Sequence, residues 1–390
     1  MIMLIWVFGI GFLALEWLIW SRRRRQNRPK NRIYYRSLAA NERILAQCPS
    51  LQDYQPPLWG VHPHLQILAA WFADRNFPIT DPDYHHQLEL DDGGTLTIDG
   101  WHAQRIDQPA LILLPTICGH SQELARLIAE FRSCWMGSIW VFNRRGHEGV
   151  PLTSPIVNSM GSTKDLRQQI HHLRQLMPDV PFYMVGLSAG SGLLFRYLGE
   201  FAEYSGLKAA VAVSPAYDIE RAFARVHLGY STLMTKRLRR YFLHRHQSSL
   251  QCVNGYQYCD QAKNLSEFHD RLFPLAGFES REQYYQNCNP MKTASSVRTR
   301  LLTLNADDDP ICIGKNVDEH LQFFTVENDN SILVRTRYGG HCAFIGTAQL
   351  SISNCFGFSK QKPKENSAPP VSWLVKVVIE YCQAVENDRI

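Results

Sequence analysis

The chain has 390 residues, 45% of them hydrophobic and 20% charged, which excludes a disordered or fibrous protein and allows one large domain with an insertion, or two domains. The formal net charge of +5 is unevenly placed, because residues 21–32 contain seven basic side chains and no acidic one. The rest of the chain is close to neutral, so its charge does not indicate a protein that binds nucleic acid.

Residues 1–20 are almost wholly apolar, and Glu16 is their one charged side chain. As a helix this segment would be about 30 Å long, which matches the hydrocarbon thickness of a bilayer. The basic residues follow the apolar run, as in an uncleaved anchor and unlike a signal peptide. We therefore expect a single-pass membrane protein with a transmembrane anchor at 1–20. The positive-inside rule predicts that the basic linker 21–33 and the body of the chain lie on the cytoplasmic side.

The ten cysteines are scattered along the chain and form no Cys-x-x-Cys pair. This pattern predicts reduced cysteines that are used as small apolar side chains, and neither a disulfide framework nor a structural zinc site. The sequence also contains no glycine-rich phosphate-binding motif. We expect no metal and no other cofactor.

Residues 34–100 are predicted to form an N-terminal segment that ends in a hairpin. Its first part has a mixed helical pattern, which Pro56-Pro57 interrupts. Residues 91–94, with the sequence Asp-Asp-Gly-Gly, then separate two strand-like runs at 87–90 and 95–99. A turn of this composition between two such runs is typical of a β-hairpin.

From residue 101 onwards, short apolar runs alternate with amphipathic helical patterns. The alternation predicts an α/β fold with a mostly parallel central sheet and helices on both faces, built from residues 101–214 and 298–390. Strands are expected at 110–114, 139–142, 182–185, 209–213, 301–304 and 332–335. Helices are expected at 121–132, 163–177, 189–203 and 316–325, with a closing helix at 371–385.

The alternation stops at residues 215–297, which are rich in aromatic and basic side chains and poor in strand-like runs. We interpret this stretch as a helical cap inserted over the core. Near the end of the chain, residues 353–370 contain Pro, Lys, Ser and Asn and are predicted to form a mobile loop.

The pentapeptide Gly186-Leu187-Ser188-Ala189-Gly190 lies directly between a predicted strand and a predicted helix. A strand, a Gly-x-Ser-x-Gly turn and a helix together form the nucleophile elbow of an α/β hydrolase. The turn must be tight to expose the serine hydroxyl above the sheet, and the flanking glycines let the strand and the helix approach closely. The pattern predicts that Ser188 is a catalytic nucleophile.

In this fold an acid and then a histidine follow the serine along the chain, each after a later strand. Residues 307–309, all aspartates, follow the strand expected at 301–304, and His341 follows the strand expected at 332–335. We predict that His341 is the general base and that Asp308 is the acid that orients it. Asp309 remains the alternative acid.

The negative charge that develops on a substrate carbonyl needs two backbone N–H donors. One is predicted to be Ala189, the residue after the nucleophile, and the other Ile117, in the loop after the first strand of the core. Thr116 precedes Ile117. Because a β-branched residue resists positive φ, this loop is expected to differ in shape from one with glycine at that position.

Several motifs in order over most of the chain resemble the membrane-anchored α/β-hydrolase-domain lipases and esterases, the AB hydrolase 4 family. They are His64-Leu65-Gln66, the hairpin turn at 91–94, Leu114–Ser121, Asn143-Arg144-Arg145-Gly146, Gly186–Gly190, Tyr197-Leu198-Gly199-Glu200, Asn305–Pro310 and Gly339-Gly340-His341.

The resemblance implies a serine hydrolase that cleaves carboxylic esters, with lipid esters such as acylglycerols or phospholipids as its substrates and an acyl-enzyme intermediate. It also places the first aspartate of the family motif on Asp308. Two alternatives stay open from the sequence. The same residues would serve an acyltransferase, in which an alcohol replaces water. The second alternative is a non-catalytic receptor with the hydrolase fold, which the presence of Thr116 in the predicted oxyanion loop favours.

Overall fold

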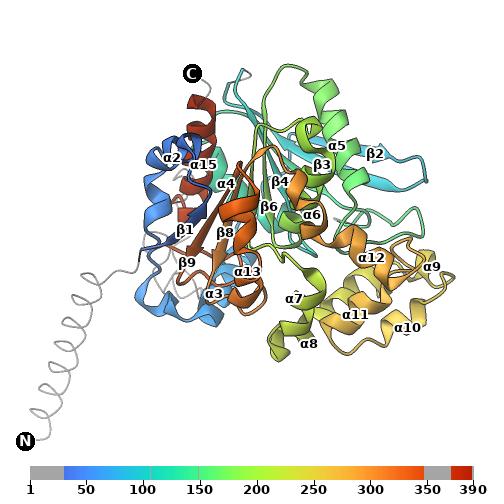
Figure 1. The fold of residues 1–390 in the computed structure, drawn as a ribbon. Coiled ribbons are helices and arrows are strands. Elements are labelled where there is room, and N and C mark those ends of the chain that lie inside the picture. Colours follow the sequence, from blue (N-terminus) through green and yellow to red (C-terminus); the bar gives the residue numbers. More distant parts are fainter. Residues whose placement is uncertain (1–29, 106, 148, 347–369, 389–390) are drawn as a thin grey trace, which may run out of the picture.

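The computed structural model describes residues 30–105, 107–147, 149–346 and 370–388, and these contain a single sheet of nine strands (Figure 1). The strand order is β1-β9-β8-β7-β6-β4-β5-β3-β2. The strands are β1 (Arg32–Tyr35), β2 (Tyr84–Glu89), β3 (Thr95–Trp101), β4 (Ala110–Leu114), β5 (Ile139–Asn143), β6 (Phe182–Leu187), β7 (Ala209–Val213), β8 (Arg300–Ala306) and β9 (Ser331–Thr336).

The centre of the sheet is parallel, as the alternating pattern predicted. Strands β5, β4, β6, β7, β8 and β9 run parallel to one another, and the six strands predicted for the core are these six within one or two residues. The hairpin around residues 91–94 is also confirmed, because β2 and β3 pair antiparallel and β3 continues antiparallel onto β5. The predicted α/β fold with a mostly parallel sheet is therefore confirmed.

The prediction missed strand β1, which begins inside the expected basic linker and ends inside the expected helical segment. It pairs antiparallel with β9 at the edge of the sheet, with Arg32 opposite Arg335. Asp307 forms ion pairs with both arginines. A strand of four residues carries almost no periodic signal, and this one is stabilised by a partner about 300 residues away in the sequence.

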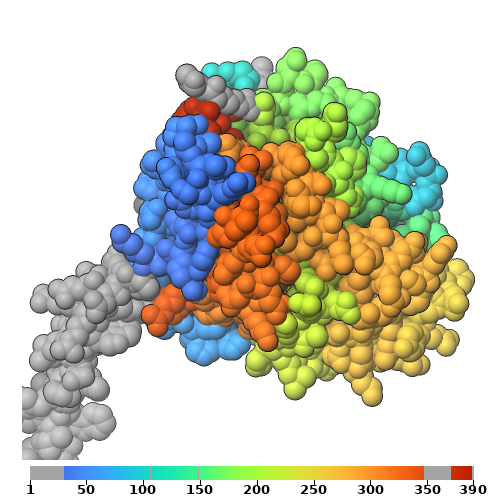
Figure 2. Space-filling view, viewed as in Figure 1, coloured from blue at the N-terminus to red at the C-terminus, as the bar shows by residue number. Residues whose placement is uncertain are grey.

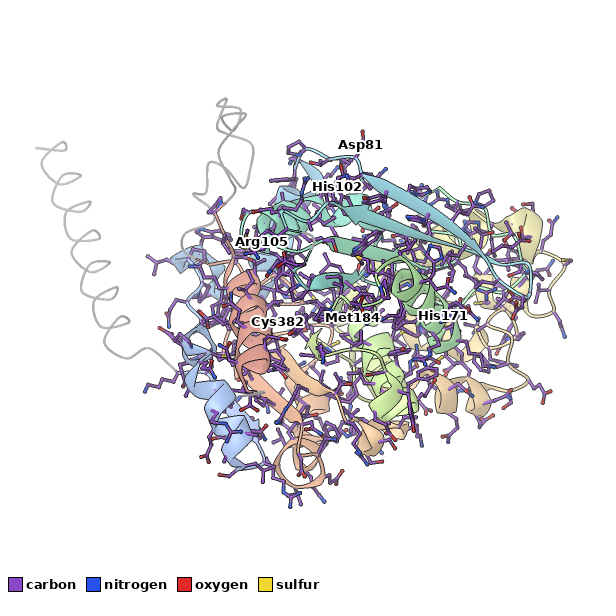
Figure 3. The ribbon with its side chains drawn as sticks, turned by 90° about the horizontal axis from the view of Figure 1, so that it is seen from above. Asp81, His102, Arg105, His171, Met184 and Cys382 are labelled. Carbon is purple, nitrogen blue, oxygen red and sulfur yellow. The ribbon has the colours of Figure 1, made fainter. Side chains whose placement is uncertain are left out.

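Helices cover both faces of the sheet. On one face α15 (Trp373–Asn387), α4 (Ala125–Arg132) and α2 (Ala39–Ala46) pack on one set of alternating strand residues, such as Val185 and Val211. On the other face α5 (Thr163–Leu176) and α6 (Ala189–Phe201) pack on the alternate set, such as Met184 and Ala210. Figure 3 shows Cys382 of α15 and His171 of α5 on opposite sides of Met184 in β6. Burial on both faces explains why these strands are nearly continuous apolar runs.

Between β7 and β8 the described chain forms helices and no strand. The insertion contains α7 (Ile219–Arg225), α8 (Leu228–Leu238), the π-helical turn η5 (Arg239–His244), α9 (Gln247–Leu250), α10 (Tyr256–Asp260), α11 (Leu265–Arg271), α12 (Arg281–Cys288) and the short turns η6 (Pro290–Lys292) and η7 (Ala294–Ser296). Its apolar cluster includes Ala189 and Cys118 of the core, so it packs over the ends of β6 and β4. Figures 1 and 2 show the insertion, coloured yellow-green to light orange, at the bottom and lower right of the molecule.

The remaining helical segments come before the hairpin or between strands of the core. Before the hairpin come η1 (Pro49–Gln52), η2 (Leu58–Val61) and α3 (Pro63–Arg75). The turn η3 (Ser121–Leu124) leads into α4, and η4 (Ala202–Tyr204) follows α6. The helix expected at 316–325 is replaced by α13 (Gly314–Asp318) and the π-helical turn η8 (Phe323–Glu327).

The predicted transmembrane anchor at 1–20 lies outside the described residues, as do most of the basic linker and nearly all of the predicted loop 353–370. In the part of the chain that the structure describes, every helix is too short or too polar to cross a bilayer.

Two glycines of α6 offer a matched test of how tightly this helix packs. A Cβ atom at Gly199 would lie 2.3 Å from the carbonyl oxygen of Thr293, whereas one at Gly192 would meet nothing closer than Pro290 Cγ, at 3.6 Å. Gly199→Ala should therefore lower the free energy of unfolding by about 2 kcal/mol. Gly192→Ala should raise it by about 0.5 kcal/mol, because alanine is favoured inside a helix. Urea denaturation of both variants measures the difference, and equal effects would contradict this packing.

Candidate active site

Ser188 lies at the turn between the last residue of β6 and the first residue of α6. Its backbone has φ of 53° and ψ of −113°, an unfavourable conformation for a residue with a side chain. The Ser188 N–H donates a hydrogen bond to the carbonyl of Val213, at 2.9 Å, which ties the turn to the end of β7. The strain is held in place by the neighbouring strand, as expected for a nucleophile elbow.

The two glycines of the pentapeptide are required by close backbone contacts. A Cβ atom at Gly186 would lie 2.5 Å from the carbonyl oxygen of Gly190, and one at Gly190 would lie 2.3 Å from that of Leu114. These distances are far below van der Waals contact, so no larger residue fits without moving the backbone. The contact at Gly190 also brings the end of β4, and the loop that follows it, beside the serine turn.

His341 connects Ser188 to a buried carboxylate. Its Nε2 atom lies 2.7 Å from Ser188 Oγ, and its Nδ1 atom lies 2.8 Å from Asp309 Oδ2. The Asp309 side chain is fully buried and that of His341 is 11% exposed. Since an ionised carboxylate can only accept hydrogen bonds, Nδ1 carries the proton and Nε2 accepts from the serine hydroxyl. This tautomer leaves His341 able to remove the serine proton.

The prediction that Asp308 orients His341 was wrong, because Asp309 is the aspartate that contacts His341. The Asp309 Oδ1 atom accepts hydrogen bonds from the backbone N–H groups of Ile311, at 2.8 Å, and Cys312, at 2.9 Å. These bonds fix the carboxylate and direct its other oxygen toward the imidazole. The side chains of adjacent residues in a tight turn point in different directions. A run of three aspartates in the sequence does not indicate which of them points toward the histidine.

Asp308 instead supports the loop that carries the histidine. Its Oδ1 atom accepts a hydrogen bond from the Gly340 N–H, at 2.9 Å, while Oδ2 is buried without a hydrogen-bond partner among the described residues. Burial is the main cause that raises the pKa of Asp308 to about 6, and the charge of Asp309 adds to it.

The histidine loop has a backbone that the two glycines of Gly-Gly-His make possible. Gly339 has φ of 150°, and a Cβ atom there would lie 2.7 Å from the Phe344 ring. Gly340 has φ of 56°, in the left-handed region. After His341, the Cys342 N–H donates to Ser214 Oγ at 3.3 Å, which joins the loop to the end of β7.

Gln66, in α3, also holds the histidine loop in place through hydrogen bonds. The sequence did not predict this role. Its side chain is fully buried. The Gln66 Oε1 atom accepts hydrogen bonds from the Ile345 N–H, at 3.3 Å, and from the Tyr54 hydroxyl, at 2.9 Å. The motif His64-Leu65-Gln66 marked this position, but its partner in the histidine loop, Ile345, lies 279 residues later in the sequence.

The predicted oxyanion donors lie on the two segments that meet at the serine turn. Ala189 is the first residue of α6, and Ile117 lies in the loop after β4. Both pack in the apolar cluster under the cap. Their placement agrees with the expectation, while the part of their N–H groups in catalysis stays a prediction.

Arg144 holds the predicted oxyanion loop, the segment after β4 that contains Ile117, and the sequence predicted no role for this side chain. Its guanidinium donates to the carbonyl oxygens of Pro115, at 3.1 Å, and Thr116, and also to that of Ser159, at 3.4 Å. Burial lowers the pKa of Arg144 to about 10, so it stays charged at neutral pH. The signal that could have found it is the motif Asn-Arg-Arg-Gly, whose Asn143 side chain also accepts a hydrogen bond from the Ser121 N–H, at 3.2 Å.

Asp309, Cys312 and His341 are the described residues closest to a metal-ligating set, with possible ligand atoms within 4.8 Å of one another. Burial raises the pKa of the Cys312 thiol well above its usual value, so the thiolate that a metal needs is disfavoured. Asp309 is also already engaged by two N–H groups and the imidazole. The chemistry of this set therefore suits proton transfer better than metal binding.

A mostly parallel sheet, a strained serine after β6 and a histidine after β9 together define an α/β hydrolase. The family model described as "Serine aminopeptidase, S33" matches residues 107–322, more than half of the chain. The chain belongs to this family of α/β hydrolases.

Curated relatives place the chain among the lipases and esterases of this family. It is 28% identical to the Embryogenesis-associated protein EMB8 of Picea glauca, over 84% of this chain and 71% of that protein. It is also 28% identical to Phospholipase ABHD3 of Mus musculus, over 76% of this chain and 75% of that protein. The Monoacylglycerol lipase of Saccharomyces cerevisiae is 27% identical, over 60% of this chain and 54% of that protein. The chain is therefore an enzyme, a carboxylic ester hydrolase.

The raised pKa of Asp308 predicts a pH dependence of stability. Between about pH 4 and pH 6, Asp308 keeps its proton in the folded protein but loses it in the unfolded chain. The free energy of unfolding therefore falls as the pH rises through this range, and the contribution of Asp308 is lost above about pH 6. Asp308→Asn removes the ionisation and keeps an acceptor for Gly340. Relative to wild type, the variant should gain about 2 kcal/mol in free energy of unfolding between pH 4 and pH 7. Urea denaturation across this range tests it, and a constant difference would refute it.

Proposed function

We propose that the chain hydrolyses lipid esters, acylglycerols or phospholipids, through an acyl-enzyme formed on Ser188. The observation that carries this proposal is the continuous hydrogen-bonded path from Asp309 through His341 to Ser188 Oγ, with distances of 2.8 and 2.7 Å. A nucleophile within reach of a base, and a base oriented by a third group, are the geometric requirements of acyl transfer to serine.

In the first half of the reaction, Ser188 Oγ attacks the ester carbonyl while His341 Nε2 takes its proton. The oxyanion that forms is stabilised by the N–H groups of Ile117 and Ala189, a contribution of about 3 kcal/mol per donor in related chemistry. Asp309 stabilises the imidazolium without taking its proton. His341 then protonates the departing alcohol, and the acyl group remains on Ser188.

In the second half a water molecule attacks the acyl-enzyme. His341 removes a proton from the water, and the second tetrahedral intermediate expels Ser188, which recovers its proton from the imidazolium. The products are a carboxylic acid and the alcohol released in the first half.

Two observations support lipid esters as the substrate class. Among the relatives with similar sequences, one is named a phospholipase and another a monoacylglycerol lipase. In this chain, Ala189 and Ile117 share an apolar cluster with cap residues such as Phe223 and Phe242. An aliphatic acyl chain suits a wall of this composition beside the serine.

We further propose that residues 1–20 anchor the chain in a membrane, with the catalytic body on the cytoplasmic side. The support is the length and apolar character of this segment and the arginines that follow it. Protease treatment of sealed vesicles of known orientation tests the proposal, since the body should be digested only where the cytoplasmic face is exposed.

A fluorophosphonate probe, which reacts with activated serines, tests the mechanism. The wild type should be labelled and Ser188→Ala should not, with hydrolysis of monoacylglycerol lowered about 10⁴-fold or more. Ser205→Ala is a matched control, because Ser205 lies after the far end of α6 and pairs with Thr299. A folded wild type that is not labelled would favour a non-catalytic receptor. Cleavage of aminoacyl amides but not of lipid esters would favour a peptidase.

A further inference from the structure

A groove of about 940 Å³ lies between α3 and the segment formed by α8 and η5. One wall carries Trp71, Phe77 and Ile79 at the end of α3 and in the chain after it, and the facing wall carries Arg240, Tyr241 and Arg245. His120 also lines the groove, and it directly follows the turn closed by the Gly119 N–H and the Thr116 carbonyl. The groove therefore adjoins the predicted oxyanion loop.

The groove contains three arginines that no carboxylate of the described chain neutralises. Arg75, Arg240 and Arg245 line it without an ion pair. Two of these guanidinium groups lie over aromatic rings of the groove, Arg75 over Trp71 at 5.3 Å and Arg245 over Tyr241 at 5.5 Å.

The acidic residues of the groove are already engaged by other arginines. Asp74 pairs with Arg126, outside the groove, and Glu123 pairs with Arg237. The positive charge of Arg75, Arg240 and Arg245 is therefore available to an anionic ligand.

Two buried polar atoms of the same groove also lack a partner among the residues described. The hydroxyl of Tyr241 and the Nδ1 atom of His120 make no hydrogen bond. Buried polar groups are normally satisfied, and an unsatisfied one costs roughly 1–3 kcal/mol.

Helix α8 and the opposite wall of the groove carry exposed apolar side chains. On α8, Leu228 is 76% exposed and Leu233 is 65% exposed, and on the opposite side Ile79 is 56% exposed and Trp71 is 44% exposed. The two sides are joined by a hydrogen bond between His64 and the Tyr230 hydroxyl, at 2.9 Å. Figure 1 shows α3 and α8 at the same end of the molecule.

We propose that α3 and α8 dock on the anionic surface of a lipid bilayer, with the groove holding a phosphate-bearing head group. The exposed leucines and Trp71 would enter the acyl region, while Arg75, Arg240 and Arg245 bind phosphates. A membrane leaflet has an anionic surface above a hydrocarbon interior. The unpaired arginines suit the anionic surface, and the apolar side chains that project beside them suit the hydrocarbon interior. A partner protein would instead be expected to supply carboxylates to a flatter surface.

This docking goes beyond the proposed ester hydrolysis and does not depend on it. It would turn the groove next to the oxyanion loop toward the lipid, so a molecule leaving the bilayer would enter near Ser188. Because binding requires no chemistry, Ser188→Ala should dock as the wild type does. Failure to dock and failure to hydrolyse are therefore separate results.

Hydrogen exchange of the full chain, measured by mass spectrometry, tests the docking surface independently of any anchor at 1–20. The chain is compared on vesicles of phosphatidylcholine alone and on vesicles with about one third phosphatidylserine. Exchange at residues 65–80 and 228–245 should slow severalfold on the anionic vesicles. The effect should shrink at about 0.5 M salt, where the Debye length is only a few ångströms.

Two double variants, one in the groove and one outside it, compare the effect of losing the same positive charge at each place. Arg240→Gln combined with Arg245→Gln should weaken the interaction with anionic vesicles about 30-fold, since each basic residue near such a surface contributes roughly a fivefold gain. The protection should be lost in this variant. Lys208→Gln combined with Lys292→Gln removes the same charge from exposed sites outside the groove and should keep the protection.

Three results would overturn the proposal. One is equal exchange of the two segments on neutral and anionic vesicles. Another is protection that inorganic phosphate reproduces in the absence of lipid, which would indicate a soluble ligand. The third is protection that rises with protein concentration without vesicles, which would assign the surface to a second copy of the chain.

Discussion

The buried carboxylate of Asp309 is the group on which the geometry of the site depends. A fully buried charge is costly unless several donors face it. Here two backbone N–H groups and the imidazole of His341 supply them. In the proposed reaction the imidazole gains a proton during attack, and the same low-dielectric surroundings would strengthen its attraction to Asp309. Burial is the main cause that raises the pKa of the neighbouring Asp308, and repulsion from Asp309 adds to it.

Around this path, separate segments hold each reacting group in position. Ser188 is fixed by the hydrogen bond of its N–H to β7 and by the close contacts of its two glycines. The histidine loop is held by Asp308 and by Gln66. The predicted oxyanion loop is held by Arg144. The hydrogen bonds among these contacts join different segments of the chain, so the folded sheet is needed to assemble the site. Preorganisation of this kind lets the chemistry proceed without reorganising the protein.

Most of the core and the contact between Ser188 and His341 could be predicted from the sequence, because both have strong local signals. The parallel strands are long apolar runs, and Ser188 and His341 stand in recognisable turns after such runs. Asp309 could not be separated from Asp308, since the choice depends on how one turn rotates. Strand β1 and the roles of Gln66 and Arg144 were missed for another reason. They are stabilised by residues distant in the sequence, and no periodicity or spacing reports such contacts.

The most direct test of this account compares Asp309→Asn with Asp308→Asn in kcat/KM for a lipid ester. Asp309→Asn should lower kcat/KM about 1,000-fold or more, because the amide removes the charge that favours the reactive tautomer and the imidazolium of His341. Asp308→Asn should lower it less than about tenfold, since the amide still accepts the Gly340 N–H and only supports the loop. A large loss in Asp308→Asn together with near-normal activity in Asp309→Asn would contradict the path from Asp309 through His341 to Ser188.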